Sequence, residues 1–386
     1  MKKTLLATAI AGALAASGAQ AATVYNQDGT KLDLYGNLQF AYANTNNDEG
    51  ESTDEFADNG STLGVAGEHV IYDGLTGYFK YEFEGDADEI KGAGGLDTGD
   101  QAYFGLKGNF GDARLGSWDP LIDDWIQDPI TNNEYFDVSD SNQNIVGIAD
   151  SREGNKLQYM SPSFSGLQFA VGTQYEGDAE AGNSADFSAA AGEFAGDTYQ
   201  ADNDGDSSAS FFGGLKYTAG AFSIAAVYDN LANNDGEVRS YTLNADDERE
   251  FGASEDFDAG DQYGITAQYT VDTLRVAAKI ERFQSDSDLV EDVNYYGVGA
   301  RYGYGMGDIY GAYQYVDVGG GDLTDTADDA FTSGDWPNEE GESYNEVMIG
   351  ATYNVSDAMY TFVEAAWYDR DEDAGDGVAV GAVYLF

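Results

Sequence analysis

Hydrophobic and polar side chains alternate with a period of two over long segments of the chain. Residues 32–42 have an apolar face and a polar face, and residues 75–84, 262–269 and 274–281 show the same alternation. The apolar face of the first segment consists of Leu32, Leu34, Leu38, Phe40 and Tyr42. Such a segment exceeds the five or six residues of a typical globular strand. The pattern therefore predicts long strands with two unlike faces.

The links between these segments alternate between short and long. Short links lie at 72–74, 109–112, 218–220, 271–273 and 356–357, and long acidic links lie at 177–207, 231–260 and 319–342. A soluble β-sandwich also alternates, but its strands are usually shorter and its turns evenly short. Short turns at one end and long loops at the other are typical of a transmembrane β-barrel, whose short turns are periplasmic and whose long loops are external.

The alternation predicts sixteen strands, an even number, as a closed antiparallel barrel requires. They are centred near residues 37, 65, 80, 103, 115, 156, 171, 213, 225, 265, 278, 298, 313, 349, 363 and 381. All four prolines, Pro120, Pro129, Pro162 and Pro337, lie in links, as expected where every strand N–H must donate. The predicted fold is therefore an all-β, 16-stranded antiparallel transmembrane barrel.

The first residues predict export. Lys2 and Lys3 precede an uncharged Ala- and Leu-rich stretch, and Ala19 and Ala21 occupy the small-residue positions of a cleavage site. Residues 1–21 are predicted to be a signal peptide, and residues 22–386 a single barrel domain. After Ala22 no apolar run approaches the length of about 18 residues that a membrane helix needs.

Composition excludes several classes of function. The chain has no cysteine, which removes disulfides and thiol chemistry. Its formal net charge of −54 argues against nucleic-acid binding. The one histidine, His69, is expected to point outward, so no hydrolytic triad is indicated and the chain is not expected to be an enzyme. A non-conducting structural barrel is a remote alternative, because sixteen strands enclose a lumen too wide for side chains to fill.

Three segments resemble the Gram-negative general porins of the enterobacterial and Vibrio type. These are residues 22–36, residues 104–111 with 114–116, and the terminal residues 384–386. The resemblance implies an outer-membrane homotrimer for passive diffusion of small hydrophilic solutes. It also implies a carboxy-terminal signal, Tyr384 and Phe386, read by the barrel assembly machinery. Outer-membrane lipid and lipopolysaccharide are expected partners.

The resemblance further implies that the third external loop, residues 118–149, folds inward and narrows the pore. Its acidic side is predicted to be Asp128, Glu134 and Asp137. The family's Pro-Glu-Phe-Gly-Gly stretch is absent, and residues 133–137 are the nearest piece.

Strand parity places nine basic side chains toward the lumen. They are Lys80, Lys107, Arg114, Arg152, Lys156, Lys216, Arg275, Lys279 and Arg301. Arg152 matches an arginine of the family's positive wall, and Lys80, Arg114 and Lys156 are predicted to share that wall. Two other family arginine positions carry Thr62 and Ile122, which thins the positive side. A cation preference is expected.

A substrate-selective porin, such as an oligosaccharide channel, is the alternative function. The loop aromatics Trp118, Trp125, Tyr135 and Phe136 either guide sugars or pin the loop to the wall. Other aromatics near strand ends are predicted to form interfacial girdles: Tyr42, Tyr72, Tyr313 and Tyr368. No cofactor is expected, although divalent cations bridging the acidic external loops to lipopolysaccharide phosphates are chemically feasible.

Overall fold

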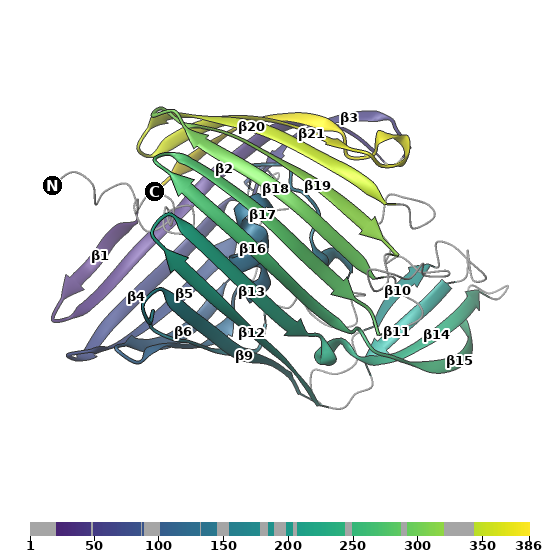
Figure 1. Cartoon of the computed structure of the whole chain (residues 1–386), viewed down its shortest axis with the longest axis horizontal. Coiled ribbons are helices and arrows are strands. Elements are labelled where there is room, and N and C mark those ends of the chain that lie inside the picture. Colours follow the sequence, from purple (N-terminus) through teal and green to yellow (C-terminus); the bar gives the residue numbers. More distant parts are fainter. Residues whose placement is uncertain are drawn as a thin grey trace.

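A computed structural model shows a closed antiparallel barrel of sixteen strands (Figure 1). It describes residues 21–386 except 48, 86, 89–100, 132, 145–153, 178–183, 189–197, 204–206, 244–248, 287–291 and 320–342. All but the last residue of the predicted signal peptide, and residues 145–149 of the predicted constriction loop, therefore lie outside the described residues.

The barrel strands confirm the sixteen predicted from periodicity. They are β2 (Thr30–Asn46), β4 (Thr62–Tyr72), β5 (Leu75–Glu84), β6 (Ala102–Gly108), β7 (Gly111–Ser117), β8 (Lys156–Met160), β9 (Leu167–Glu176), β12 (Ser208–Ala219), β13 (Phe222–Asn230), β16 (Asp261–Val271), β17 (Leu274–Gln284), β18 (Val293–Gly303), β19 (Asp308–Val318), β20 (Tyr344–Ser356), β21 (Met359–Tyr368) and β22 (Gly377–Leu385). Each pairs with its neighbour along the chain, and β22 pairs with β2 to close the cylinder.

Two short strands extend the barrel sheet along β2. β1 (Ala22–Gln27) pairs with the first residues of β2, and β3 (Ser52–Asp58) pairs with its last residues. The backbone of Phe386 exchanges two hydrogen bonds of 3.0 Å with Gly36 of β2. The end of the chain is thus held in the same row of hydrogen bonds that closes the barrel.

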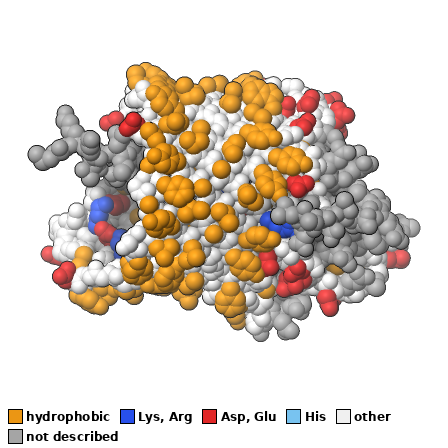
Figure 2. Space-filling model, in the orientation of Figure 1, with side chains coloured by type: hydrophobic (Ala, Val, Ile, Leu, Met, Phe, Trp, Pro, Cys, Tyr) orange, Lys and Arg blue, Asp and Glu red, His pale blue; other side chains and the backbone are white. Residues whose placement is uncertain are grey.

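Alternation along each strand separates a lipid-facing surface from a lumen-facing one. On β20, Ile349 points outward and is 52% exposed, whereas Met348 points inward and is fully buried. Figure 2 shows hydrophobic side chains spread over the outer wall of the strands, with Asp and Glu mostly beyond this zone. Among the described residues, no helix is long and apolar enough to cross a membrane.

One girdle prediction is wrong. Tyr42, Tyr72 and Tyr313 point outward as expected, but Tyr368 is 6% exposed and donates a hydrogen bond of 2.8 Å to the main-chain oxygen of Asp137. Its neighbour Trp367 takes the outward position on β21. Strand parity, rather than aromatic character, decides which residue of this pair meets lipid.

The long external links contain structure that periodicity does not predict. Four strands form a separate antiparallel sheet beside the barrel rim (Figure 1). They are β10 (Ser184–Ser188), β11 (Thr198–Asn203), β14 (Gly236–Leu243) and β15 (Arg249–Phe257). Short helical turns complete the described elements: η1 (Asp123–Gln127), α2 (Asp128–Thr131), η2 (Ser141–Asn144), η4 (Ala232–Asn234) and η5 (Asp371–Asp373).

Candidate functional site: the inward-folded loop and the pore wall

The link after β7 packs against the inner wall of the barrel. Its first part packs on the inner face of β9, β12 and β13, where apolar side chains of loop and wall form one buried cluster. The loop contributes Leu121, Ile122, Trp125 and Ile126, and the wall contributes Ala170, Phe212, Ala225 and Val227. Wall glycines permit this close approach, because a Cβ on Gly264 would lie 2.7 Å from Ile126 and one on Gly214 2.9 Å from Trp125.

The tip of the loop packs further around the barrel. Ile130, Phe136 and Val138 are buried against inward apolar side chains of β2, β17 and β19 to β22. This second cluster includes the ring of Tyr310 and the side chains of Met348 and Phe362. The loop is therefore laid along one side of the lumen, and its tip is part of the barrel's inner packing.

Three buried glutamates of the wall accept the hydrogen bonds of the loop. Glu364 on β21 accepts from the main-chain N–H groups of residues 134, 135 and 136 at 2.8, 2.7 and 2.8 Å. Glu346 on β20 accepts from the N–H of Ser139 at 2.8 Å. Glu281 on β17 accepts from the N–H of Ser141 at 2.8 Å and from Gln127 Nε2 at 2.6 Å.

These carboxylates satisfy amide groups that the loop leaves without partners in a water-poor contact. An unpaired buried N–H costs about 1–3 kcal/mol, and hydrogen bonds to an ionised acceptor are stronger than neutral ones. Glu364 is 1% exposed, and it also accepts from the hydroxyl of Tyr310. The three glutamates therefore help to fix where the loop sits.

The predicted acidic residues lie at the tip, in different surroundings. Glu134 accepts a hydrogen bond of 2.9 Å from the Tyr360 hydroxyl. Burial raises the pKa of Glu134, although the Tyr360 hydrogen bond and the Arg301 charge act in the opposite direction. The side chain of Asp128, in α2, is outside the part of the structure that is described.

Asp137 still contacts the water of the lumen, although protein surrounds much of it. The lost hydration and the nearby carboxylates of Glu364 and Asp140 raise its pKa to about 7. Hydrogen bonds from Asn133 oppose this shift. Asp137 therefore changes charge near neutral pH, unlike an ordinary aspartate with a pKa of about 3.9.

The predicted basic wall is only partly available to the lumen. Lys80 on β5 lies inward, with its Nζ 3.2 Å from Glu82. Arg114 on β7 lies inward, with its guanidinium 4.2 Å from the centre of the Trp118 ring and 5.4 Å from that of Tyr103. Arg152 lies outside the described residues.

The pore-wall role predicted for Lys156 is wrong. Its side chain points inward, but the residue is 2% exposed and its Nζ donates to the main-chain oxygen of Trp118. The Trp118 ring lies 4.9 Å from the same Nζ. Lys156 thus holds the start of the loop, because the loop covers the wall position that parity assigned to the lumen.

The loop aromatics favour the pinning interpretation. Trp118, Trp125 and Phe136 are at most 5% exposed, so their faces contact protein. Tyr135 is half-buried and donates a hydrogen bond of 3.0 Å to Glu55 of β3. Asn59, which follows β3, donates a hydrogen bond of 2.7 Å to the main-chain oxygen of Glu134. The first external loop, which contains β3 and Asn59, thus holds the tip from the external side.

Sequence reasoning missed Glu281, Glu346 and Glu364. The available signal was parity, since each lies at an inward position of its strand. Within the described chain no group of three or more His, Cys, Asp or Glu residues is arranged to hold a metal ion.

Comparison with known proteins gives one consistent family. A family model described as Gram-negative porin matches residues 7–373. A "Monosaccharide porin" of Halomonas sp and a "Major outer membrane protein" of Halomonas elongata are each 58% identical to this chain, over 100% of both chains.

Solved structures share the fold. An anion-selective porin from Comamonas acidovorans is similar with a TM-score of 0.64 and 16% identity, covering 92% of this chain and 100% of that one. OmpT of Vibrio cholerae, in its trimer form, has a TM-score of 0.58 and 15% identity, covering 93% and 100%.

Replacing Glu364 by Ala should loosen the loop tip, because three main-chain amides lose their acceptor. We expect greater current noise in the open state and a changed conductance in planar bilayers. Glu82→Ala is the matched control. It also removes an inward carboxylate of the wall, but Glu82 forms its ion pair with Lys80 of the same strand, β5. Noise equal to that of the unchanged protein would show that Glu364 does not hold the tip.

Proposed function

The chain belongs to the Gram-negative porins, and we propose that it forms a water-filled, cation-preferring channel for small hydrophilic solutes. The family and the barrel are those of outer-membrane channel proteins rather than enzymes. The observation that carries the cation preference is that basic and acidic groups along the lumen differ in how far protein neutralises or covers them. Several inward basic groups are compensated by carboxylates or covered by the loop, whereas the loop tip retains acids beside water.

Several inward bases have a carboxylate within ion-pair distance. Lys279 lies 3.0 Å from Glu281, and Arg370 lies 2.9 Å from Glu346. Lys80 has Glu82, and Lys156 is covered by the loop. An ion pair has almost no net field beyond a Debye length of about 8 Å at physiological salt. These bases therefore add little attraction for anions.

The tip supplies the opposing charge. Asp137 faces the water of the lumen, and Glu134 lies three residues before it in the chain. A constriction lined by carboxylates raises the local concentration of cations and lowers that of anions. The surplus of 71 acidic over 17 basic residues in the whole chain acts in the same direction at the external mouth.

We extend the proposal to assembly. The trimer form of OmpT and the family resemblance support a homotrimer with one pore per subunit. Tyr384 is half-exposed on the outer wall, and Phe386 is tied to Gly36 by its backbone. Recognition of these two residues by the assembly machinery, and contact of the acidic loops with lipopolysaccharide, directly or through divalent cations, belong to the same proposal.

The double variant Glu134→Gln with Asp137→Asn should weaken the cation preference. Both side chains keep their size, so the loss of charge at the tip is the main change. The measurement is the reversal potential in a KCl gradient across a planar bilayer, and we expect the cation sign for the unchanged protein. Asp54→Asn, in β3 on the external side, is the control. A double variant with an unaltered reversal potential would remove these acids from the selectivity mechanism.

The cation preference should also depend on pH near neutrality. A raised pKa means that Asp137 is ionised above about pH 7 and gains its proton as the pH falls through 7. The reversal potential should therefore shrink between about pH 8 and pH 6, before ordinary carboxyls titrate. The Asp137→Asn variant should have the weaker cation preference over this whole pH range, and its reversal potential should not change near pH 7. A step of equal size in that variant would assign the titration to another group.

A second candidate function is a preference for monosaccharides. Its support is the 58% identity to a protein named "Monosaccharide porin". In this chain Tyr78 and Tyr103 are half-buried on the inner wall, 6.2 Å apart, beside the start of the loop, where the Trp118 ring lies 5.9 Å from Tyr103. Aromatic faces suit the apolar faces of sugar rings.

Glucose added to both chambers distinguishes the two functions. A general pore should lose current in proportion to the added sugar. A monosaccharide-preferring pore should show saturable block by glucose and less block by the trisaccharide raffinose. Tyr103→Ala should weaken the saturable component, and a proportional loss with both sugars would leave only the general pore.

A further inference from the structure

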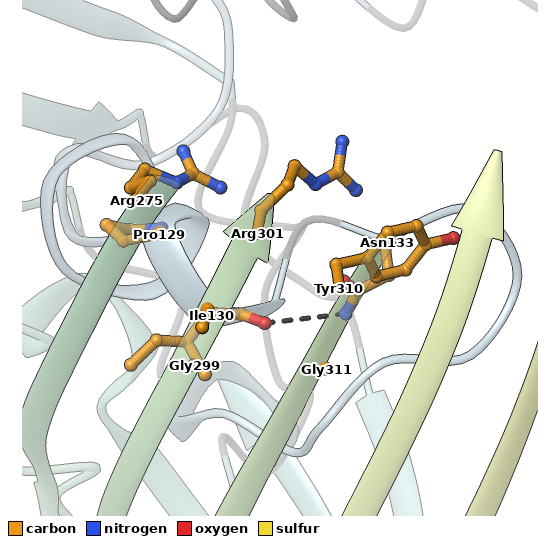
Figure 3. A pocket seen from close by; sticks show the side chains of 9 residues that line it. Pro129, Ile130, Asn133, Arg275, Gly299, Arg301, Tyr310 and Gly311 are labelled. Carbon is orange, nitrogen blue, oxygen red and sulfur yellow. Dashed lines mark hydrogen bonds between the residues drawn. The ribbon is translucent and has the colours of Figure 1, made fainter. Parts of the chain in front are cut away.

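A recess lies between the tip of the loop and the inner wall of β17, β18 and β19. Its lining includes Pro129, Ile130 and Asn133 of the loop and Arg275, Arg301 and Tyr310 of the wall (Figure 3). Its volume of about 10 Å³ is room for one water-sized group. Arg275 lies near the start of β17, which a short turn joins to β16, and Arg301 lies near the end of β18, which a short turn joins to β19. Short turns are periplasmic in this type of barrel, so the recess is on the periplasmic side.

Arg275 and Arg301 are direct cross-strand partners in the β17–β18 pair. Figure 3 shows both side chains extending from adjacent strands in the same general direction. Like charges placed directly opposite each other destabilise a sheet. The pair therefore places two positive charges side by side on the inner wall, beside the recess.

The guanidinium of Arg301 is held but not neutralised. Its carbon lies 4.2 Å from the centre of the Tyr310 ring, which limits its freedom. Lys80, Lys279, Arg282 and Arg370 each have a carboxylate within 4.0 Å. No ion pair of Arg301 occurs among the described residues. Glu134 is near enough to feel its charge, but it directs its carboxylate to Tyr360.

We propose that Arg301, with Arg275 beside it, forms a weak binding site for the carboxylate of a small hydroxylated organic acid, such as a sugar acid. A guanidinium presents paired donors that match the two oxygens of a carboxylate. One carboxylate oxygen fits the water-sized recess, and the hydroxylated remainder of the solute stays in the water of the lumen. Asn133 also lines the recess, and its side chain donates a hydrogen bond of 3.4 Å to the main-chain oxygen of Ile130.

This site goes beyond the proposed cation preference and needs only the open channel. The acids of the tip set the average concentration of each ion in the constriction. The arginine pair acts over a few ångströms on the periplasmic side of the tip, and it selects by contact. An anionic solute that passes the tip would pause there, whereas a neutral sugar of equal size would not.

The test compares glucuronate with glucose, which differ at one carbon. Potassium glucuronate is added to the periplasmic side of single channels at about 0.1 M KCl, where screening is moderate. We expect glucuronate to reduce the current saturably and glucose to do so less. Arg301→Gln should raise the half-blocking concentration about tenfold, the loss expected for one charge-assisted contact. The half-blocking concentration of Arg301→Lys should lie between those of the unchanged protein and Arg301→Gln, because lysine keeps the charge but lacks the paired donors.

Lys107→Gln is the matched control. Lys107 is an inward base near the periplasmic end of β6, and it pairs with Glu68 at 2.9 Å. An equal effect of Lys107→Gln would assign the block to the general field of the mouth and overturn the site. Equal block by glucuronate and glucose would overturn it as well. Normal single-channel openings in Arg301→Gln without added solute would show that the channel persists while the site is lost.

Discussion

The whole structure depends on hydrogen bonding of backbone groups that cannot reach water. In hydrocarbon every strand N–H and C=O needs a partner, which forces β2 to pair with β22 and leaves no open edge in the membrane. The same requirement holds inside the barrel, where the loop lies against an apolar wall. The loop has no partner strand there, so its amides are satisfied by the carboxylates of Glu281, Glu346 and Glu364.

This requirement links the position of the loop to the field in the pore. A carboxylate is well suited to hold several converging amides, and burying it is costly unless it receives such donors. The wall under the loop is therefore acidic, and Lys279 and Arg370 compensate it locally. Basic groups engaged in this way are withdrawn from the lumen. The cation preference proposed for the channel thus arises partly from how the loop is anchored.

The barrel could be predicted because lipid imposes one rule on every outward position. Ile349 and Trp367 must be apolar whatever their neighbours, so a period of two reveals all sixteen strands. Inward positions obey no comparable rule. Parity places Lys156 inside but does not indicate that Trp118 covers it, and the amide partners of Glu364 lie about 230 positions away in the chain. The external sheet was missed because its strands lie within long links whose many Asp, Asn and Gly residues favour loops.

The loop tip and the wall behind it bring both signs of charge within a short distance, and these charges act over different ranges. Asp137 touches the lumen's water, so it affects every ion that passes. Arg301 is oriented by the Tyr310 ring, and Tyr310 also donates to Glu364, the residue that holds the tip. The position of the arginine and that of the loop are thus coupled through one tyrosine. A shift of the tip would alter the recess and the constriction together, so the proposed carboxylate site and the proposed cation preference depend on the same position of the loop.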